Sequence, residues 1–196
     1  VLAAFALCSL FISQANAALI FEDDFGAGSN QGVISGDFGN WTVNSGNIDL
    51  WNFGGAFNPG YAVDMNGSRA LGSIQTQSEF NLLAGTNYAL SFLLGNNQHV
   101  ADNGLEFGLM NDDGILAFDI ISDVRSLLAG LQTSSTVVTL YFSPDADVNA
   151  SIFFTSTGTA DFGAAIIDNV TLVPEPATLG IFALGMLGLA SRRFNK

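Results

Sequence analysis

Basic residues are scarce over most of this 196-residue chain. Of the five present, Arg192, Arg193 and Lys196 fall in the last five positions, which leaves only Arg69 and Arg125 elsewhere. All 18 acids lie between residues 18 and 175, so this stretch has a net charge of −16. A surface of this sign repels the phosphates of nucleic acids and anionic lipids. Neither nucleic acid nor an anionic membrane surface is therefore expected as a partner.

Histidine occurs once, as His99, and no Gly-x-Ser-x-Gly motif is present. A nucleophilic serine needs a base, usually histidine, that is oriented by an acid. His99 lies in a polar stretch, residues 95–102, which is typical of an exposed loop. A glycosidase needs two positioned carboxylates, and several acids here, such as Asp37, Asp112 and Asp113, stand beside Gly or Asn, where turns favour them. The sequence therefore predicts no catalytic residues and no enzymatic activity, and a small glycan hydrolase is the least favoured alternative.

The first segment of the chain is apolar. Residues 1–12 read VLAAFALCSLFI, and Ala15-Asn16-Ala17 follows shortly afterwards. A short apolar run that ends in Ala-x-Ala is typical of a secretory signal peptide, so cleavage is predicted after Ala17, with Ala15 and Ala17 as the small residues that are recognised. No positive leader precedes the run, and we expect the signal peptide to be truncated at its start. Its removal also removes Cys8, the only cysteine, so the mature protein is expected to contain no disulfide.

A second apolar run, residues 177–190, is followed directly by Arg192 and Arg193. It is short for a bilayer span, which takes about 20 residues, but the arginines are typical of an anchor with its end in the cytoplasm. Pro174-Glu175-Pro176 precedes the run. The prolines keep this junction extended and outside any helix or central strand, so we expect it to be exposed to a protease. A plain membrane anchor and a processed signal are both open on these residues.

The order of these features is similar to the PEP-CTERM sorting signal of exported proteins in Gram-negative bacteria. Val-Pro-Glu-Pro-Ala-Thr, an apolar helix, Arg-Arg and the chain end follow one another over residues 173–196. The resemblance implies that an exosortase-type enzyme recognises Pro174, Glu175 and Pro176. It also implies a precursor held transiently in the inner membrane and then moved to the cell surface or the extracellular matrix. The expected division is a signal peptide (1–17), an ectodomain (18–173) and a sorting signal (174–196).

The central stretch contains many β-favouring runs separated by turn sequences, and little that favours helices. Short strands at near-even spacing predict an all-β fold, an antiparallel β-sandwich, with a short apolar helix only at the C-terminus. Residues 123–131 are the one central segment that predicts a helical turn or two. Strands are predicted at 41–43, 70–75, 88–94, 105–110, 115–120, 137–142, 151–155 and 165–172, and turns at 66–67, 103–104, 112–114 and 143–145.

Parts of this central stretch also resemble a known family. FEDDF (residues 21–25), NWTVNSGNIDLW (40–51) and AAIIDNVTLVPEP (164–176) are similar to exported PEP-CTERM proteins with choice-of-anchor domains. The resemblance implies a galactose-binding-like jelly roll, and many relatives of that fold are carbohydrate-binding modules. We therefore expect a non-enzymatic surface or matrix protein, with a carbohydrate-binding module that recognises exopolysaccharide as the alternative.

Four aromatic residues in one loop are candidates for sugar contact. Trp51, Phe53, Phe57 and Tyr61 are interleaved with Asn, Gly and Pro over residues 50–61. Flat rings stack on the C–H faces of sugars, and a loop can present them to solvent. The alternative, that these rings cap the core, stays open. Trp41, in a strand pattern, is predicted to lie in the core.

The same resemblance implies a structural calcium ion. In jelly-roll modules, Ca²⁺ bridges the first strand and an aspartate of the last strand, and Asp168 matches that aspartate. The family's first-strand glutamate falls at Gly26, so Glu22 and Asp24 are the nearest substitutes. Glu22, Asp24 and Asp168 are therefore candidate Ca²⁺ ligands. An acidic strand end that simply faces water is the equally open alternative.

Overall fold

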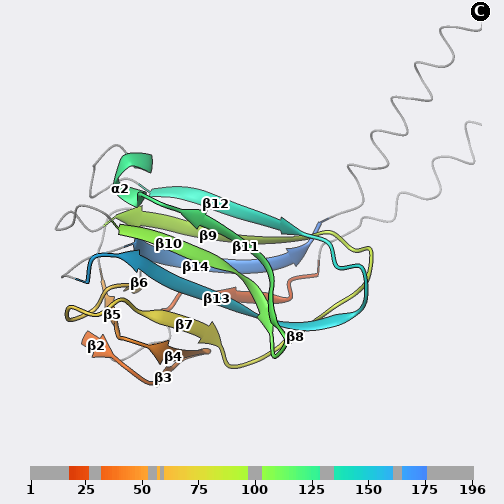
Figure 1. Ribbon diagram of the computed structural model, residues 1–196, viewed down its shortest axis with the longest axis horizontal. Coiled ribbons are helices and arrows are strands. Elements are labelled where there is room, and N and C mark those ends of the chain that lie inside the picture. The colour runs from red at the N-terminus through yellow and green to blue at the C-terminus, as the bar shows by residue number, and fades with distance from the viewer. Residues whose placement is uncertain are drawn as a thin grey trace, which may run out of the picture.

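A computed structural model describes residues 18–26, 32–52, 57, 60–96, 103–128, 135–160 and 165–175. These residues form two antiparallel sheets that pack face to face (Figure 1). The predicted all-β sandwich is confirmed. The strands of sheet A are β1 (Phe21–Asp23), β2 (Gly32–Ile34), β5 (Ile48–Trp51), β6 (Ala62–Asp64), β9 (Tyr88–Asn96), β12 (Ser135–Phe142) and β14 (Ala165–Pro174). Those of sheet B are β3 (Asp37–Phe38), β4 (Trp41–Ser45), β7 (Ser73–Thr76), β8 (Phe80–Leu82), β10 (Asn103–Asn111), β11 (Gly114–Ile121) and β13 (Val148–Gly158).

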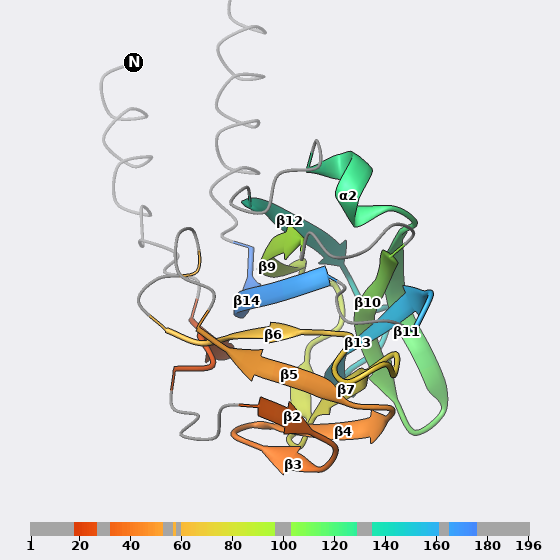
Figure 2. The same ribbon diagram turned by 90° about the vertical axis from the view of Figure 1, so that its left-hand side faces the viewer.

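The strand order places the longest strands next to one another in each sheet. Sheet A runs β12-β9-β14-β6-β5-β2, with β1 paired to β14, and sheet B runs β11-β10-β13-β7-β4-β3, with β8 paired to β13. Viewed from one end, β12 lies at an edge of sheet A and β11 at an edge of sheet B (Figure 2). Consecutive strands thus often lie in different sheets, as expected when a chain crosses between the two layers of a sandwich.

All eight predicted strands are present, and the strands that were missed are short. β1, β2, β3, β5, β6 and β8 have two to four residues each, too few for an alternating pattern to stand out. The predicted helical turn is present as α2 (Val124–Leu127), where the Asp123 carboxylate accepts a hydrogen bond from the Ser126 amide at 3.0 Å. The turn predicted at residues 103–104 is wrong, because both residues pair with β13 inside β10.

Apolar side chains from alternate positions of both sheets form the main core. Phe92 of β9 meets Phe107 of β10 and Phe154 of β13, with ring centroids 4.8 and 5.0 Å apart, respectively. Trp41 is fully buried, and its ring centroid lies 5.8 Å from that of Phe154. The predicted core position of Trp41 is therefore confirmed. Because inward side chains recur at every second residue, the residues between them lie on the outer faces of the sheets.

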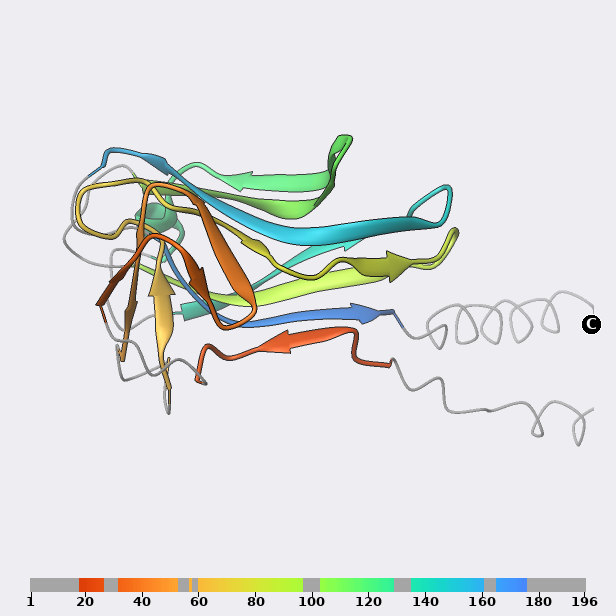
Figure 3. The ribbon, with the colours of Figure 1, turned by 90° about the horizontal axis from the view of Figure 1, so that it is seen from below.

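The first and last described residues lie at the same end of the sandwich (Figure 3). The Ile20 amide donates a hydrogen bond to the Leu172 carbonyl at 3.0 Å, so the chain enters beside the strand by which it leaves. The predicted signal peptide, residues 1–17, and the apolar run 177–190 lie outside the described residues. Among the described residues, no helix is both long and apolar enough to cross a bilayer.

Candidate functional site

The last strand extends into the predicted sorting motif. Pro174 is the final residue of β14 and pairs with Tyr88, and the Glu175 amide donates to the Asn87 carbonyl at 2.7 Å. Both motif residues are half-buried. The expectation that Pro174 stays outside any central strand, in an exposed junction, is wrong, because β14 lies between β9 and β6. A proline is tolerated there because a strand end can do without one ladder donor.

The other residues of the two targeting signals lie outside the described ranges. They are Ala15 and Ala17 of the predicted cleavage site, and Pro176, Arg192 and Arg193 of the predicted sorting signal. Their roles stay predictions.

The described loop aromatics comprise one exposed ring, one buried ring and one half-buried ring. Trp51, the last residue of β5, is 46% exposed. Phe57 is buried in a small apolar cluster with Ala62 and Ile166 on the outer face of sheet A. Its ring lies so close to Gly95 that a Cβ there would collide with it. Tyr61 packs against the main core, and Phe53 lies outside the described residues.

These positions correct one part of the predicted sugar platform. A buried ring cannot stack on a sugar, so the assignment of Phe57 as a sugar contact is wrong. It covers apolar surface, as the alternative interpretation of the loop expected. In the described part of the loop, Trp51 is the aromatic side chain most open to a ligand.

Asp168 is a buried carboxyl group near the first strand. It is 4% exposed and accepts a hydrogen bond from the Asn169 amide at 2.7 Å. Burial raises the pKa of Asp168 to about 6; the negative charges of Asp24 and Asp23 also raise it, and the Asn169 hydrogen bond opposes the shift. The calcium prediction requires this closeness between Asp168 and the first strand. Glu22 instead is exposed, in a pair with Thr171.

The described carboxylates fit a calcium ion only in part. Asp24 is exposed, and its Oδ1 accepts a hydrogen bond from the Gly26 amide at 2.9 Å. No three His, Cys, Asp or Glu side chains in the described ranges form a group that could hold a metal ion. Ca²⁺ takes six to eight oxygen ligands, so backbone oxygens would have to join Asp24 and Asp168. Calcium binding stays a prediction.

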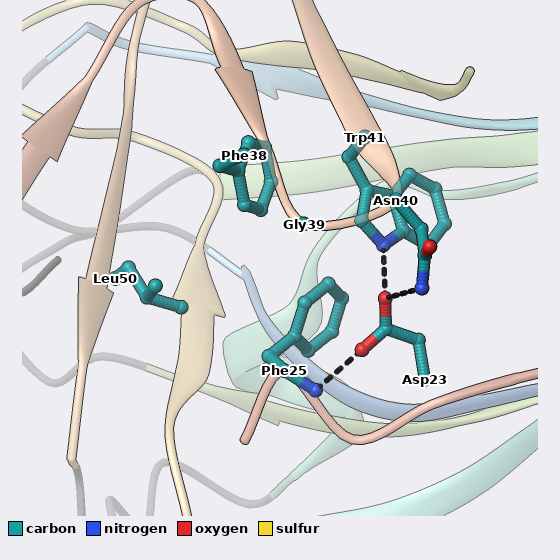
Figure 4. A pocket seen from close by; sticks show the side chains of 7 residues that line it. All are labelled: Asp23, Phe25, Phe38, Gly39, Asn40, Trp41 and Leu50. Atoms are coloured by element: carbon teal, nitrogen blue, oxygen red, sulfur yellow. Dashed lines mark hydrogen bonds between the residues drawn. The ribbon is translucent and has the colours of Figure 1, made fainter. Parts of the chain in front are cut away.

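Asp23, the last residue of β1, links this strand to sheet B through hydrogen bonds. Its Oδ1 accepts a hydrogen bond from the Phe25 amide at 2.8 Å. Its Oδ2 accepts from Asn40 Nδ2 at 3.0 Å and from Trp41 Nε1 at 2.9 Å (Figure 4). Phe25 has a φ of 54°, which is uncommon for a residue with a side chain. The carboxylate therefore satisfies the buried indole and holds a strained backbone in place.

The pocket beside Asp23 is too small for a sugar. Its volume is about 40 Å³, and Phe25, Phe38, Trp41 and Leu50 line it together with Asp23 (Figure 4). Ligand pockets usually measure roughly 300 Å³ or more. The carboxylate of Asp23 accepts these three hydrogen bonds from donors of the protein itself. We conclude that Asp23 has a structural role.

Two further carboxylates face each other without forming a catalytic pair. Asp49 of β5 lies directly opposite Asp64 of β6. Burial raises the pKa of Asp49. Asp64 is 2% exposed and accepts a hydrogen bond from the Asn66 amide at 3.0 Å. Both carboxyl groups of a glycosidase must reach the glycosidic bond, and Asp64 is closed to it.

The outer face of sheet B has a different chemistry from the rest of this acidic chain. The register places Thr42, Gln75, Phe153, Gly108 and Phe118 side by side across β4, β7, β13, β10 and β11. Phe118 is 52% exposed, whereas Phe153 is covered by its neighbours, with 5% exposed. Five strands about 4.8 Å apart make this row roughly 19 Å long. We call it the sheet B row.

Polar side chains beside the sheet B row are held in place by one another. Asn44 Nδ2 donates to Gln75 Oε1 at 3.0 Å, and the hydroxyls of Ser73 and Thr155 lie 2.9 Å apart. Ile120 extends the apolar end of the face and is paired with Glu106. Amides and hydroxyls thus lie on the same outer face as an exposed ring, three strands away from it in the case of Gln75. Such a face can bind an extended ligand that has both hydroxyl groups and C–H faces.

Sequence reasoning missed this face and chose the loop after β5. The sequence did contain a signal, which is the alternation of inward and outward residues along β4, β7 and β13. Their outward positions carry Thr, Asn, Ser and Gln, although a chain with this net charge would be expected to carry acids there. It could not be read as one site, because the residues that form it lie far apart in the chain: Thr42 and Phe153 are 111 positions apart.

A family model for the PEP-CTERM protein-sorting motif matches residues 172–193. The resemblance of the tail to this signal is therefore confirmed, and it indicates a substrate of an exosortase-type enzyme with an exported, membrane-anchored precursor. A search of curated protein sequences finds no match.

Solved structures with a similar fold include binding modules and enzymes. The CBM22-1 xylan-binding domain of Paenibacillus barcinonensis Xyn10C is 12% identical, with a TM-score of 0.50 over 81% of this chain and 95% of that one. An apo-form cyclase from Fischerella sp. is 17% identical, with a TM-score of 0.54 over 83% and 98%. Arabinose-bound MgGH51 α-L-arabinofuranosidase is 17% identical, with a TM-score of 0.57, but this chain spans only 27% of it.

The likeness at these identities concerns the fold. The chain is a jelly-roll β-sandwich of the kind found in carbohydrate-binding modules, and it carries a PEP-CTERM sorting motif near its end. Both a binding domain and a cyclase share the sandwich, so function has to be argued from the chemistry of the site.

Proposed function

We propose that this chain is an exported, non-enzymatic protein of the cell surface or extracellular matrix, and that its jelly roll binds a neutral polysaccharide along the sheet B row. The observation that carries the proposal is that Gln75, Thr42 and the exposed Phe118 lie in one row on the same outer face. The sorting motif supports the export part, since an exosortase-type enzyme acts on such tails at the membrane.

The position of the chain ends favours display of this face. The segment that leads into β1 and the end of β14 lie at the same end of the sandwich (Figure 3). The sheet B row instead crosses the outer face of sheet B, from β4 to β11. Attachment or release at the tail therefore leaves the row open to a long polymer.

Charge selects the class of polysaccharide. The stretch that contains the domain has a net charge of −16, so an anionic polymer would be repelled. Glu106 and Asp37 are acids on this outer face, and Asp37 accepts a hydrogen bond from Thr42 Oγ1 at 2.6 Å. Amides and hydroxyls exchange hydrogen bonds with neutral sugar hydroxyls without such a penalty. The xylan-binding name of one similarly folded domain points to the same class of ligand.

The test is binding of the full-length protein to neutral polysaccharides, including xylan and the neutral polymers of its own host, by affinity electrophoresis. We expect Phe118→Ala and Gln75→Ala each to weaken binding at least about tenfold, since each removes a direct contact. Trp51→Ala, an exposed aromatic on the other sheet, is the matched control and should bind normally. Loss of binding in Trp51→Ala alone would move the site to the loop after β5. Absence of binding to any polymer would leave only the surface-protein part.

A further inference from the structure

Edge strands of a sheet expose unpaired backbone N–H and C=O groups, and proteins usually protect them. Four strands lie at the ends of the two strand orders: β2 and β12 in sheet A, β3 and β11 in sheet B. β2 and β3 have only three and two residues. β11 carries Asp119 opposite the core residue Phe107, and its pairing with β10 is interrupted by a register shift. Shortness, charge and irregularity are the usual protections, and these three edges have them.

β12 has none of these protections. Its sequence, STVVTLYF, contains no charge, proline or glycine, and it pairs with β9 without interruption from Ser135 to Phe142. Val137 and Tyr141 are 68% and 65% exposed, the highest values among the large hydrophobic side chains in the described part of the chain. At about 3.4 Å per residue this edge is roughly 27 Å long. It is a regular, apolar strand open to pairing.

The edge is self-complementary about Thr139. In an antiparallel pair of two β12 strands centred on this residue, Thr139 faces Thr139, and each Val137 faces a Tyr141 of the other copy. Threonine pairs and pairs of an aromatic with a β-branched residue are favourable cross-strand neighbours. The two most exposed hydrophobic side chains would therefore cover each other, and the same patch would serve both copies, as a two-fold interface requires.

Charge also limits where a second copy can approach. The stretch that forms the domain carries a net −16, so two copies repel each other over most of their surface. β12 and its neighbour β9 contain no acid, so this edge is where two such molecules can approach at least electrostatic cost. A cationic partner would gain nothing here. We propose that two copies of this protein pair through β12, antiparallel and centred on Thr139, to join their A sheets into one (β12 is the uppermost strand in Figure 1).

The proposal fixes a register, and cysteine cross-linking of the full-length chain tests it. In a Cys8→Ser background, Thr139→Cys alone should form a disulfide-linked dimer on mild oxidation, because the residue faces itself and opposite Cβ atoms are near bonding distance. Val137→Cys alone and Tyr141→Cys alone should not, but the two variants expressed together should cross-link to each other. Val33→Cys, equally placed on the other edge of sheet A, is the matched control and should stay monomeric.

A second measurement uses charge. Val137→Lys should shift the protein from dimer to monomer in light scattering, with unchanged thermal unfolding of the monomer, whereas Val33→Lys should leave the dimer intact. Failure of Thr139→Cys to cross-link, or equal cross-linking of all single variants, would overturn the proposed register. Wild-type protein that stays monomeric at every concentration up to about 1 mM would overturn the interface itself. A dimer with a dissociation constant above that concentration has little free energy of association. Neither result depends on polysaccharide binding.

Discussion

The amide of Glu175 donates a hydrogen bond to the carbonyl of Asn87, with 2.7 Å between nitrogen and oxygen. Glu175 is the central residue of the Pro-Glu-Pro sequence, so the motif is partly tied to the folded domain. An enzyme that recognises this residue in an extended chain has to displace the end of β14 from the loop that precedes β9. We therefore expect processing at this motif to be linked to the pairing of the last strand.

The carboxylate of Glu175 is the first target for mutation. We expect Glu175→Gln to leave membrane insertion intact but to stop release of the domain, because a charge-assisted hydrogen bond from the enzyme would be lost. Fractionation of native cells with mass measurement of each fraction checks this. Glu79→Gln, an exposed acid before β8, is the matched control. Wild-type mature protein that still carries Arg192 and Arg193 would show a plain anchor.

The link between Glu175 and Asn87 gives a second prediction about the tail. A Gly-Ser-Gly-Ser insertion between Val173 and Pro174 separates the motif from β14, so the enzyme no longer has to open strand pairing. We expect release to become several-fold faster in a pulse-chase measurement. The same insertion in the exposed turn at residues 112–113 should not alter the rate. Slower release from the tail variant would show that the enzyme needs the docked motif.

The raised pKa of Asp168 predicts that stability depends on pH. Its value of about 6 lies above the ordinary 3.8, so the folded state binds this proton more tightly than the unfolded state. Stability should therefore fall as pH rises from about 4 to 6 and stay lower above that range. The cost at pH 7 is at most about 3 kcal/mol. With a chelator present to remove Ca²⁺, Asp168→Asn should unfold at a higher urea concentration than wild type at pH 7. The difference between the two midpoints should shrink at pH 4.

Calcium gives the same carboxylate a separate test. If Ca²⁺ binds at Asp168 and Asp24, millimolar CaCl₂ should raise the unfolding temperature of wild type at pH 7 through binding linkage. Asp168→Asn should lose this response and keep its response to NaCl, which only screens charge. Glu22 is exposed and paired with Thr171, so Glu22→Gln should retain the calcium response. Equal responses of wild type to CaCl₂ and NaCl at matched ionic strength would exclude the site.

Asp23 should matter more for stability than any exposed acid. Asp23→Ala removes the acceptor of Trp41 Nε1, a buried donor, and releases the strained turn at Phe25. We expect a loss of about 2–4 kcal/mol in the free energy of unfolding by urea. Asp112→Ala, in an exposed turn, should change it by less than about 0.5 kcal/mol. Similar losses in the two variants would show that the hydrogen bonds of Asp23 contribute little.

The longer strands and the sorting motif could be predicted from sequence because their signals are local. β9, β10, β13 and β14 show a β-rich pattern over nine or more residues, and Pro174-Glu175-Pro176 lies in order with its apolar run and arginines. The short strands carry too few residues for a pattern, and they form because neighbouring strands supply their hydrogen bonds. Asn103-Gly104 has the composition of a turn but is held in β10 by pairing with β13.

The sites were decided by tertiary structure. Phe57 and Trp51 have the same local surroundings of Asn, Gly and Pro, yet one ring covers Gly95 and the other faces solvent. The sheet B row exists only because Gln75 and Phe118, 43 positions apart, share one face of one sheet. Sequence by itself determined the class of fold, the acidic surface and the sorting motif near the C-terminus, which depend on composition and short motifs. Burial and strand register determined which side chains are available to a ligand or a partner, since both are set by contacts between residues far apart in the chain.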